Sequence, residues 1–83
     1  MMYIPHEERS KLMKLYIQNR DAVVELPRDL WVADVCSRGL IVSSNPVKPY
    51  IGEYSSVERA REVLREIFEY HRNGKNSYVL PKE

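Results

Sequence analysis

Residues 52–81 constrain the fold of this chain more than any other stretch, because they contain a long amphipathic pattern with defined ends. Ser55 stands three residues before Glu58, which is the spacing of a capping box, and Ser56 is an alternative N-cap. Gly74 suits the C′ position that ends a helix. Between these ends a 3–4 spacing predicts a helix with one buried face, formed by Ala60, Val63, Leu64, Ile67 and a half-buried His71.

The residues before this helix alternate in polarity and predict β-strands. Leu15 and Ile17 begin the alternation, and the polar turn at residues 19–21 leads into a second apolar run at 23–26, as in a hairpin. Three more strands are expected at residues 30–36, 40–42 and 47–54, and a short edge strand is expected at 78–80.

Two residues indicate irregular positions among these strands. Gly39 follows the third strand and is expected to take a positive φ in the turn there. Pro49 has no N–H to donate, which indicates an edge position or a bulge, and Gly52 indicates a bulge or a close approach of the helix to the sheet. Together these patterns predict an α+β fold of order ββββαβ, with an antiparallel sheet of four or five strands packed by one amphipathic helix.

The length of 83 residues predicts one domain. Residues 1–12 fit neither the helical nor the strand period. We therefore expect residues 1–12 to be an N-terminal extension, either disordered or a translated leader before a start at Met13, and residues 13–83 to be a single α+β domain.

Charge and cysteine content restrict the class of protein. The chain has 13 basic and 12 acidic residues, and its net charge of +1 argues against a strongly basic nucleic-acid binder. Cys36 is the sole cysteine, which excludes an internal disulfide and fits a reducing compartment. Because no apolar run reaches about 20 residues and the N-terminus does not resemble a signal peptide, we expect a cytoplasmic protein that does not enter the membrane.

The residues that commonly carry chemistry form no recognisable motif. Cys36 would need a nearby base to act as a nucleophile, and the only histidines are His6 in the extension and His71 at the helix end. These three residues match no zinc-binding spacing, and the three glycines are isolated and form no phosphate-binding loop. We expect a protein that is not an enzyme and that has no metal or cofactor.

The chain resembles a group of small uncharacterised proteins from low-GC Gram-positive bacteria and their phages or mobile elements. Members carry Gly-x-Tyr-x-Thr/Ser-x-Glu-Arg-Ala-x-x-Val-Leu-x-x-Ile, matched here from Gly52 to Ile67, and Tyr-x-Met-Pro, matched by 78–81 with Leu80 in place of Met. Members also tend to open with an Ile-Arg-Ser-Gln-Asp-like hairpin, which residues 17–21 match here. The resemblance extends over residues 13–83 and implies a cellular context, but no activity.

The strands at 30–36 and 40–42 are apolar on both faces, which is more than a sheet covered on one side requires. A protein partner, a second copy or a long loop could cover the second face. Alternatively, the strand is central and the N-terminal segment packs across it. We therefore predict a non-enzymatic accessory or adaptor protein of phage or mobile-element type that acts through protein contacts, with a homodimer as one form. The expected contact residues are Trp31, Val35, Ile41, Tyr50 and Tyr54.

Binding of single-stranded nucleic acid is the alternative function. Aromatic residues of the sheet could stack on bases, although the same residues are those that a small sheet uses for its own packing. The basic residues expected to contact the phosphates lie in or beside the predicted loops and are Arg20, Arg28, Arg38 and Lys48.

Overall fold

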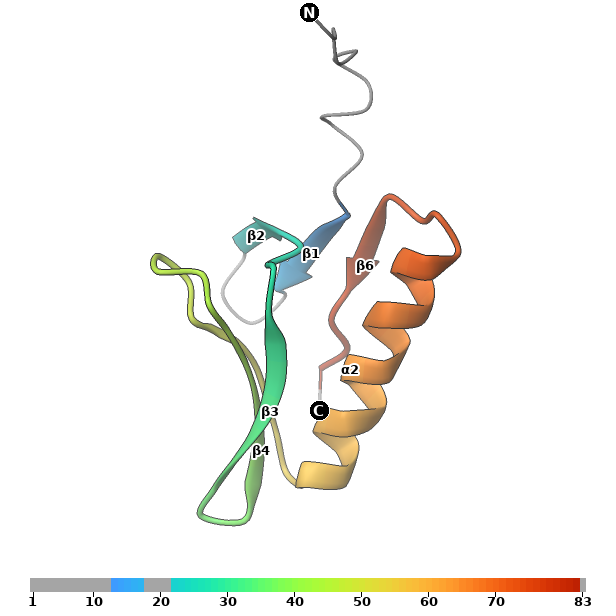
Figure 1. The fold of residues 1–83 in the computed structure, drawn as a ribbon. Helices are drawn as coiled ribbons and strands as arrows, with labels where there is room; N and C mark the ends of the chain where they lie inside the picture. The colour runs from blue at the N-terminus through green and yellow to red at the C-terminus, as the bar shows by residue number, and fades with distance from the viewer. Residues whose placement is uncertain (1–12, 18–21, 83) are drawn as a thin grey trace, which may run out of the picture.

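The computed structural model describes residues 13–17 and 22–82 (Figure 1). In this part of the chain there are six strands and one helix, which confirms the α+β class. The elements, in chain order, are β1 (Lys14–Ile17), β2 (Ala22–Glu25), β3 (Leu30–Val35), β4 (Arg38–Ser43), β5 (Tyr50–Tyr54), α2 (Val57–Arg72) and β6 (Ser77–Val79).

The strands form two sheets of three, in the orders β2-β1-β6 and β3-β4-β5, instead of the one sheet of four or five that we expected. Pro27 lies between β2 and β3, where a residue without an N–H interrupts the ladder. The first sheet is also not purely antiparallel, because β6 pairs with β1 in parallel. A helix between two strands permits this parallel return, and α2 is the helix that makes it. The expectation that the last strand lies at an edge is confirmed.

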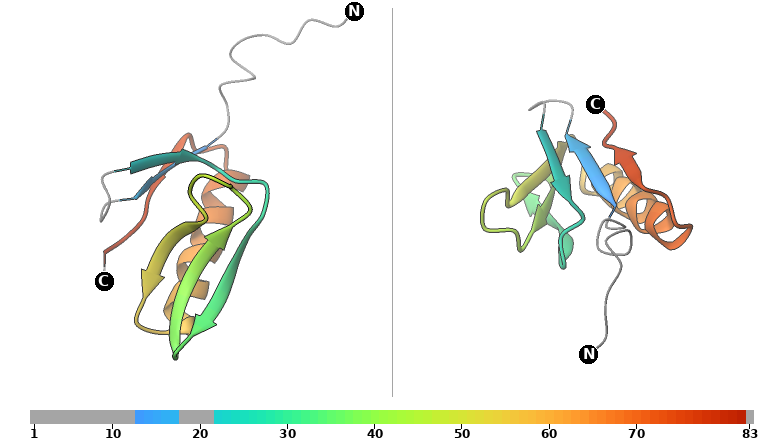
Figure 2. Two further views of the ribbon diagram at one scale, coloured as in Figure 1. Left: turned by 90° about the vertical axis from the view of Figure 1, so that its left-hand side faces the viewer. Right: turned by 90° about the horizontal axis from the view of Figure 1, so that it is seen from above.

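The helix α2 packs on one face of the β3-β4-β5 sheet, and the β2-β1-β6 sheet lies across one end of this pair of layers (Figures 1 and 2). The core fills the space between the three parts and draws on all of them. Its members are Met13, Leu15, Ile17, Val24, Ile41, Ile51, Tyr54, Ala60, Val63, Ile67, Tyr78 and Leu80.

The turn between β3 and β4 differs from the expected one. Cys36 and Ser37 have φ angles of 52° and 67°, so they, and not Gly39, occupy the left-handed region. Val35 pairs with Arg38, and two central residues with positive φ between paired strand ends are characteristic of a type I′ turn.

Gly39 is required for a different reason, which is that β4 lies directly against the start of α2. A Cβ added at Gly39 would be 2.6 Å from the Cβ of Ala60 and 2.9 Å from the Cα of Val57. The close approach of helix to sheet that we considered for Gly52 therefore occurs at Gly39.

The helix begins and ends close to the expected residues. Of the two candidate N-caps, Ser56 fills the position, and its Oγ accepts a hydrogen bond from the N–H of Arg59 at 3.1 Å. Gly74 follows the C-cap with a φ of 74°, which confirms its predicted role. The expected stripe is buried at Ala60, Val63 and Ile67 and half-buried at Leu64, but His71 is exposed.

The strand β5 starts directly after Pro49 and lies at an edge of its sheet. Its register with β4 shifts, since Ile41 pairs with Gly52 while Val42 pairs with Tyr50, which leaves Ile51 as an extra residue. Both the edge position and the bulge indicated by the sequence are therefore present.

Candidate protein-contact surface

The strand register separates the side chains of the β3-β4-β5 sheet into two faces. Gly39 and Ile41 of β4 are buried on the side of α2, so the residues that alternate with them point away from the helix. We call this second side the outer face. Its residues are Trp31, Ala33 and Val35 of β3, Arg38, Leu40 and Val42 of β4, and Tyr50 and Glu53 of β5.

An apolar row crosses all three strands of the outer face. Val42 in the central strand pairs with Trp31 on one side and with Tyr50 on the other. Trp31 is 47% exposed and Tyr50 is 53% exposed, so the two aromatic side chains flank a partly buried valine. In the left view of Figure 2 these strands lie in front of α2, and no other helix or strand of the described residues covers them.

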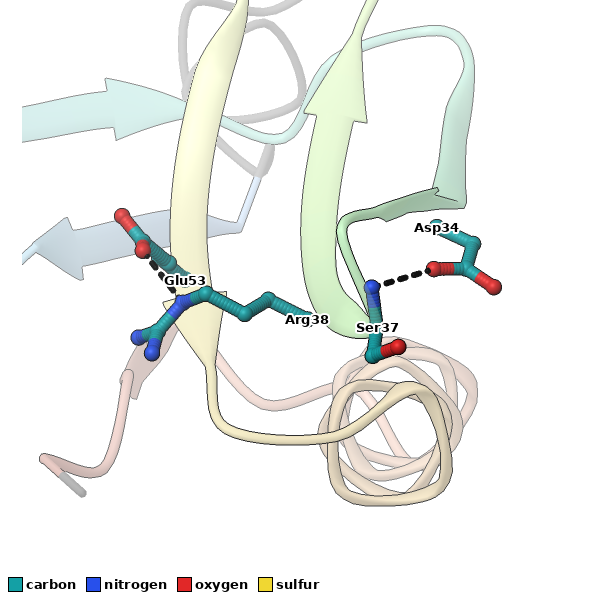
Figure 3. A network of polar contacts seen from close by, with 4 residues as sticks. All are labelled: Asp34, Ser37, Arg38 and Glu53. Atoms are coloured by element: carbon teal, nitrogen blue, oxygen red, sulfur yellow. Dashed lines mark hydrogen bonds and ion pairs between the residues drawn. The ribbon is translucent and has the colours of Figure 1, made fainter.

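A pair of opposite charges lies on the same face, toward the end that holds the β3–β4 turn. The Nε of Arg38 is 2.7 Å from an Oε2 of Glu53, across β4 and β5 (Figure 3). Both side chains are more than half exposed, so water screens the pair and it stabilises the fold by at most about 1 kcal/mol. Both charges remain accessible to a partner.

The structure brings together three of the five expected contact residues. Trp31, Val35 and Tyr50 lie on the outer face, and each is about half exposed. Ile41 and Tyr54 are 0% and 2% exposed, so they belong to the core and are not part of the outer face. The sequence shows that apolar residues occupy both parities of these strands, but it does not show which parity the helix covers.

The expected nucleic-acid contacts do not gather on one surface. Arg28 precedes β3 and Lys48 precedes β5, so both lie at the same end of the antiparallel sheet. Arg38 lies at the opposite end and is paired with Glu53. Arg20 lies outside the described residues.

A second exposed apolar row, on the β2-β1-β6 sheet, was missed by the sequence analysis. Tyr16 pairs with Val23 on one side and with Val79 on the other, and all three side chains are exposed. The signal available in the sequence was the position of Tyr16 between Leu15 and Ile17, both of which are buried. This row lies on a different sheet from the outer face.

Tyr78 is buried and also makes a polar contact, and both features raise the pKa of its phenol. Its Oη donates a hydrogen bond to a carboxylate oxygen of Glu66 at 2.8 Å, and its ring and the Tyr70 ring pack edge to face with their centroids 4.9 Å apart. Burial, and then the hydrogen bond and the negative charge of Glu66, raise the pKa of the Tyr78 phenol above its usual value. These contacts join α2 to β6 and give Tyr78 a structural role.

Other kinds of site receive no support in the described ranges, 13–17 and 22–82. Cys36 is exposed in the β3–β4 turn and is not the buried small side chain that a free cysteine commonly is. No group of three or more acidic, histidine or cysteine side chains could hold a metal ion within these ranges. The one helix found there is too short and too polar to cross a bilayer.

Comparison with known proteins adds no family: no family model, no curated protein and no solved structure matches this chain.

Proposed function

We propose that this chain is a non-enzymatic accessory or adaptor protein that acts through protein contacts made by the outer face. This proposal rests on the row Trp31–Val42–Tyr50, which is exposed on the side of the sheet away from α2. Tryptophan and tyrosine are among the residues that contribute most to binding when a partner buries them. A phage or mobile-element context rests on the sequence resemblance alone.

The proposed first partner of the outer face is a second copy of the chain. Opposite charges on one face can make that face self-complementary, because a two-fold axis parallel to the strands, between β4 and β5, would place Arg38 of each copy opposite Glu53 of the other. A stable interface usually buries about 800 Å² on each partner. The outer face belongs to a sheet of only three strands, so we expect it to bury no more than this area. We therefore expect a weak dimer that depends on concentration.

Sedimentation velocity over a wide concentration range tests this proposal. The wild-type chain should shift from monomer to dimer as its concentration rises, and the variant Trp31→Ser should remain monomeric with an unchanged circular dichroism spectrum. Val47→Ser is the matched control, because Val47 is 81% exposed but lies in the β4–β5 connection, outside the outer face. A wild-type chain that stays monomeric up to millimolar concentration would contradict self-association, as would a Trp31→Ser variant that dimerises like the wild type.

The described residues give no observation that favours nucleic-acid binding over protein contact. Arg28 and Lys48 lie at the end of the sheet that holds Trp31 and Tyr50, whereas Arg38 lies at the opposite end and is paired with Glu53. Two cations beside the aromatic residues are fewer than the continuous basic groove that single-strand binding proteins combine with stacking residues.

A further inference from the structure

A groove with a volume of about 230 Å³ runs along the open edge of β5. One wall is β5 itself, from Tyr50 to Tyr54, and the other wall is the C-terminal segment from Leu80 to Lys82. Ile17 of β1 also lines it, as does Leu40 of β4. The groove therefore lies where the two sheets and the C-terminal segment meet.

Hydrogen bonds hold the C-terminal segment in place as the second wall of the groove. The Oη of Tyr54 donates a hydrogen bond to the carbonyl oxygen of Pro81 at 2.9 Å, which joins β5 to the C-terminal segment. The N–H of Leu80 donates to the carbonyl oxygen of Tyr16 at 3.0 Å, which holds the same segment against β1. Leu80 and Ile51 are almost fully buried, so the base of the groove is built from core residues.

The volume restricts what the groove can hold. A cavity of about 150 Å³ accommodates a benzene ring, whereas sites for drug-sized molecules and cofactors have about 300–1,000 Å³. The groove is therefore suited to one large side chain. Of the two charged residues in its lining, Glu53 is paired with Arg38 and Lys82 stands on the opposite wall. The base formed by Ile51 and Leu80 is apolar and therefore favours an apolar side chain.

The strand that forms the first wall can also bind a peptide main chain. β5 pairs with β4 on one side, and on its other side no strand neighbours it among the described residues. An edge strand offers main-chain donors and acceptors that an extended peptide can pair with, while a pocket beside the edge selects its side chains.

We propose that the edge of β5 binds an extended peptide segment of another protein, and that one aromatic or leucine side chain of this segment enters the groove. This binding uses the edge of the sheet, whereas the proposed function uses its outer face. The two share Tyr50, Leu40 and Glu53 at the rim, but Trp31 and Val35 do not line the groove. The variant Trp31→Ser therefore separates them, because it should lose self-association and keep peptide binding.

The test is an NMR titration of the isotope-labelled full chain with three capped peptides. The first is Thr-Val-Phe-Val-Thr, the second has Asp in place of Phe, and the third keeps Phe but is N-methylated at every residue, so that none of its residues has an N–H to donate to a strand. We expect the Phe peptide to cause saturable shifts at residues 50–54 and 80–82, in the wild type and in Trp31→Ser. Binding of the other two peptides should be weaker by about tenfold or more.

The proposal is overturned if the Phe peptide gives no saturable shift at millimolar concentration, if the three peptides bind alike, or if the shifts centre on Trp31.

A variant of the groove gives a second test. In Gly52→Ala the new Cβ would lie 3.0 Å from Tyr54 Cε2 and 3.1 Å from Leu80 Cδ2, between two side chains that line the groove. We expect this methyl group to weaken binding of the Phe peptide, and unchanged affinity in the folded variant would count against the site. If Gly52→Ala does not fold, the three peptides on the wild-type chain decide.

Discussion

At the scale of single residues, Gly39 has the tightest surroundings of the three glycines. A Cβ there would meet Ala60 and the backbone of α2, and neither can move without displacing the helix. We expect Gly39→Ala to lower the free energy of unfolding by about 1–3 kcal/mol, as overpacking of a core does. Gly52→Ala should cost less, because the atoms that its methyl group meets are the ends of side chains. Urea denaturation of the two variants measures the order, and an equal or reversed order would contradict this account of Gly39.

Tyr78 gives a second prediction at this scale, and it concerns alkaline pH. Burial and the contact with Glu66 raise the pKa of the Tyr78 phenol in the folded chain. Below about pH 10 the phenol is protonated in both the folded and unfolded states, so its contribution to stability is fully present. Above that pH the unfolded chain loses the proton first, and the free energy of unfolding falls as pH rises.

The variant Tyr78→Phe has no phenol to titrate at this position. Its free energy of unfolding should therefore fall less steeply than that of the wild type above about pH 10. At neutral pH it should be lower than that of the wild type by about 0.5–1.5 kcal/mol, the net value of one hydrogen bond. Denaturant unfolding at a series of pH values measures both effects, and parallel pH profiles would show that Tyr78 is not the group responsible.

At the scale of elements, α2 depends on its N-cap. Ser56 accepts a hydrogen bond from the N–H of Arg59, so removal of the hydroxyl group leaves that donor without its partner at the first turn. We expect Ser56→Ala to lower the free energy of unfolding by about 1 kcal/mol, and Ser56→Asp to retain most of the wild-type value. Thermal unfolding followed by circular dichroism compares the two. A Ser56→Ala variant as stable as the wild type would mean that the cap contributes little.

The same scale explains which features the sequence predicts. The helix, its ends and most of the strands follow from local periodicity and from residues such as Ser56, Gly74 and Pro49, whose effects act within a few positions. The division into two sheets and the parallel pairing of β6 with β1 depend on contacts between residues far apart in the chain, which periodicity does not encode. The turn at Cys36 and Ser37 was missed because neither residue is a usual choice for positive φ.

The candidate surface follows the same division between local and long-range information. Trp31, Val35 and Tyr50 were recognised as an apolar excess, and the structure places all three on the outer face. Ile41 and Tyr54 are likewise apolar or aromatic residues of expected strands, and only the position of the helix assigns them to the core. The groove beside β5 was not foreseen, because the C-terminal segment meets β5 only in the folded chain.

At the scale of the whole molecule, α2 covers one face of the β3-β4-β5 sheet (Figure 1). Two separate apolar rows remain exposed. The outer face has two aromatic side chains and a pair of opposite charges. The row on the β2-β1-β6 sheet consists of Tyr16, Val23 and Val79. Because both rows are apolar, exposure alone does not distinguish them. The proposal that the outer face is the contact surface therefore requires that the two rows behave differently in solution.

An NMR dilution series that follows individual side chains tests this claim most directly. If the outer face joins two copies, the indole signal of Trp31 and the methyl signals of Val35 and Val42 should shift as the concentration rises. The methyl signals of Val23 and Val79 should stay unchanged, because these residues lie on the other sheet. Both are 50% exposed, so they are the matched control for exposure. Shifts confined to Val23 and Val79 would contradict the account, as would the absence of any shift at the outer face up to millimolar concentration.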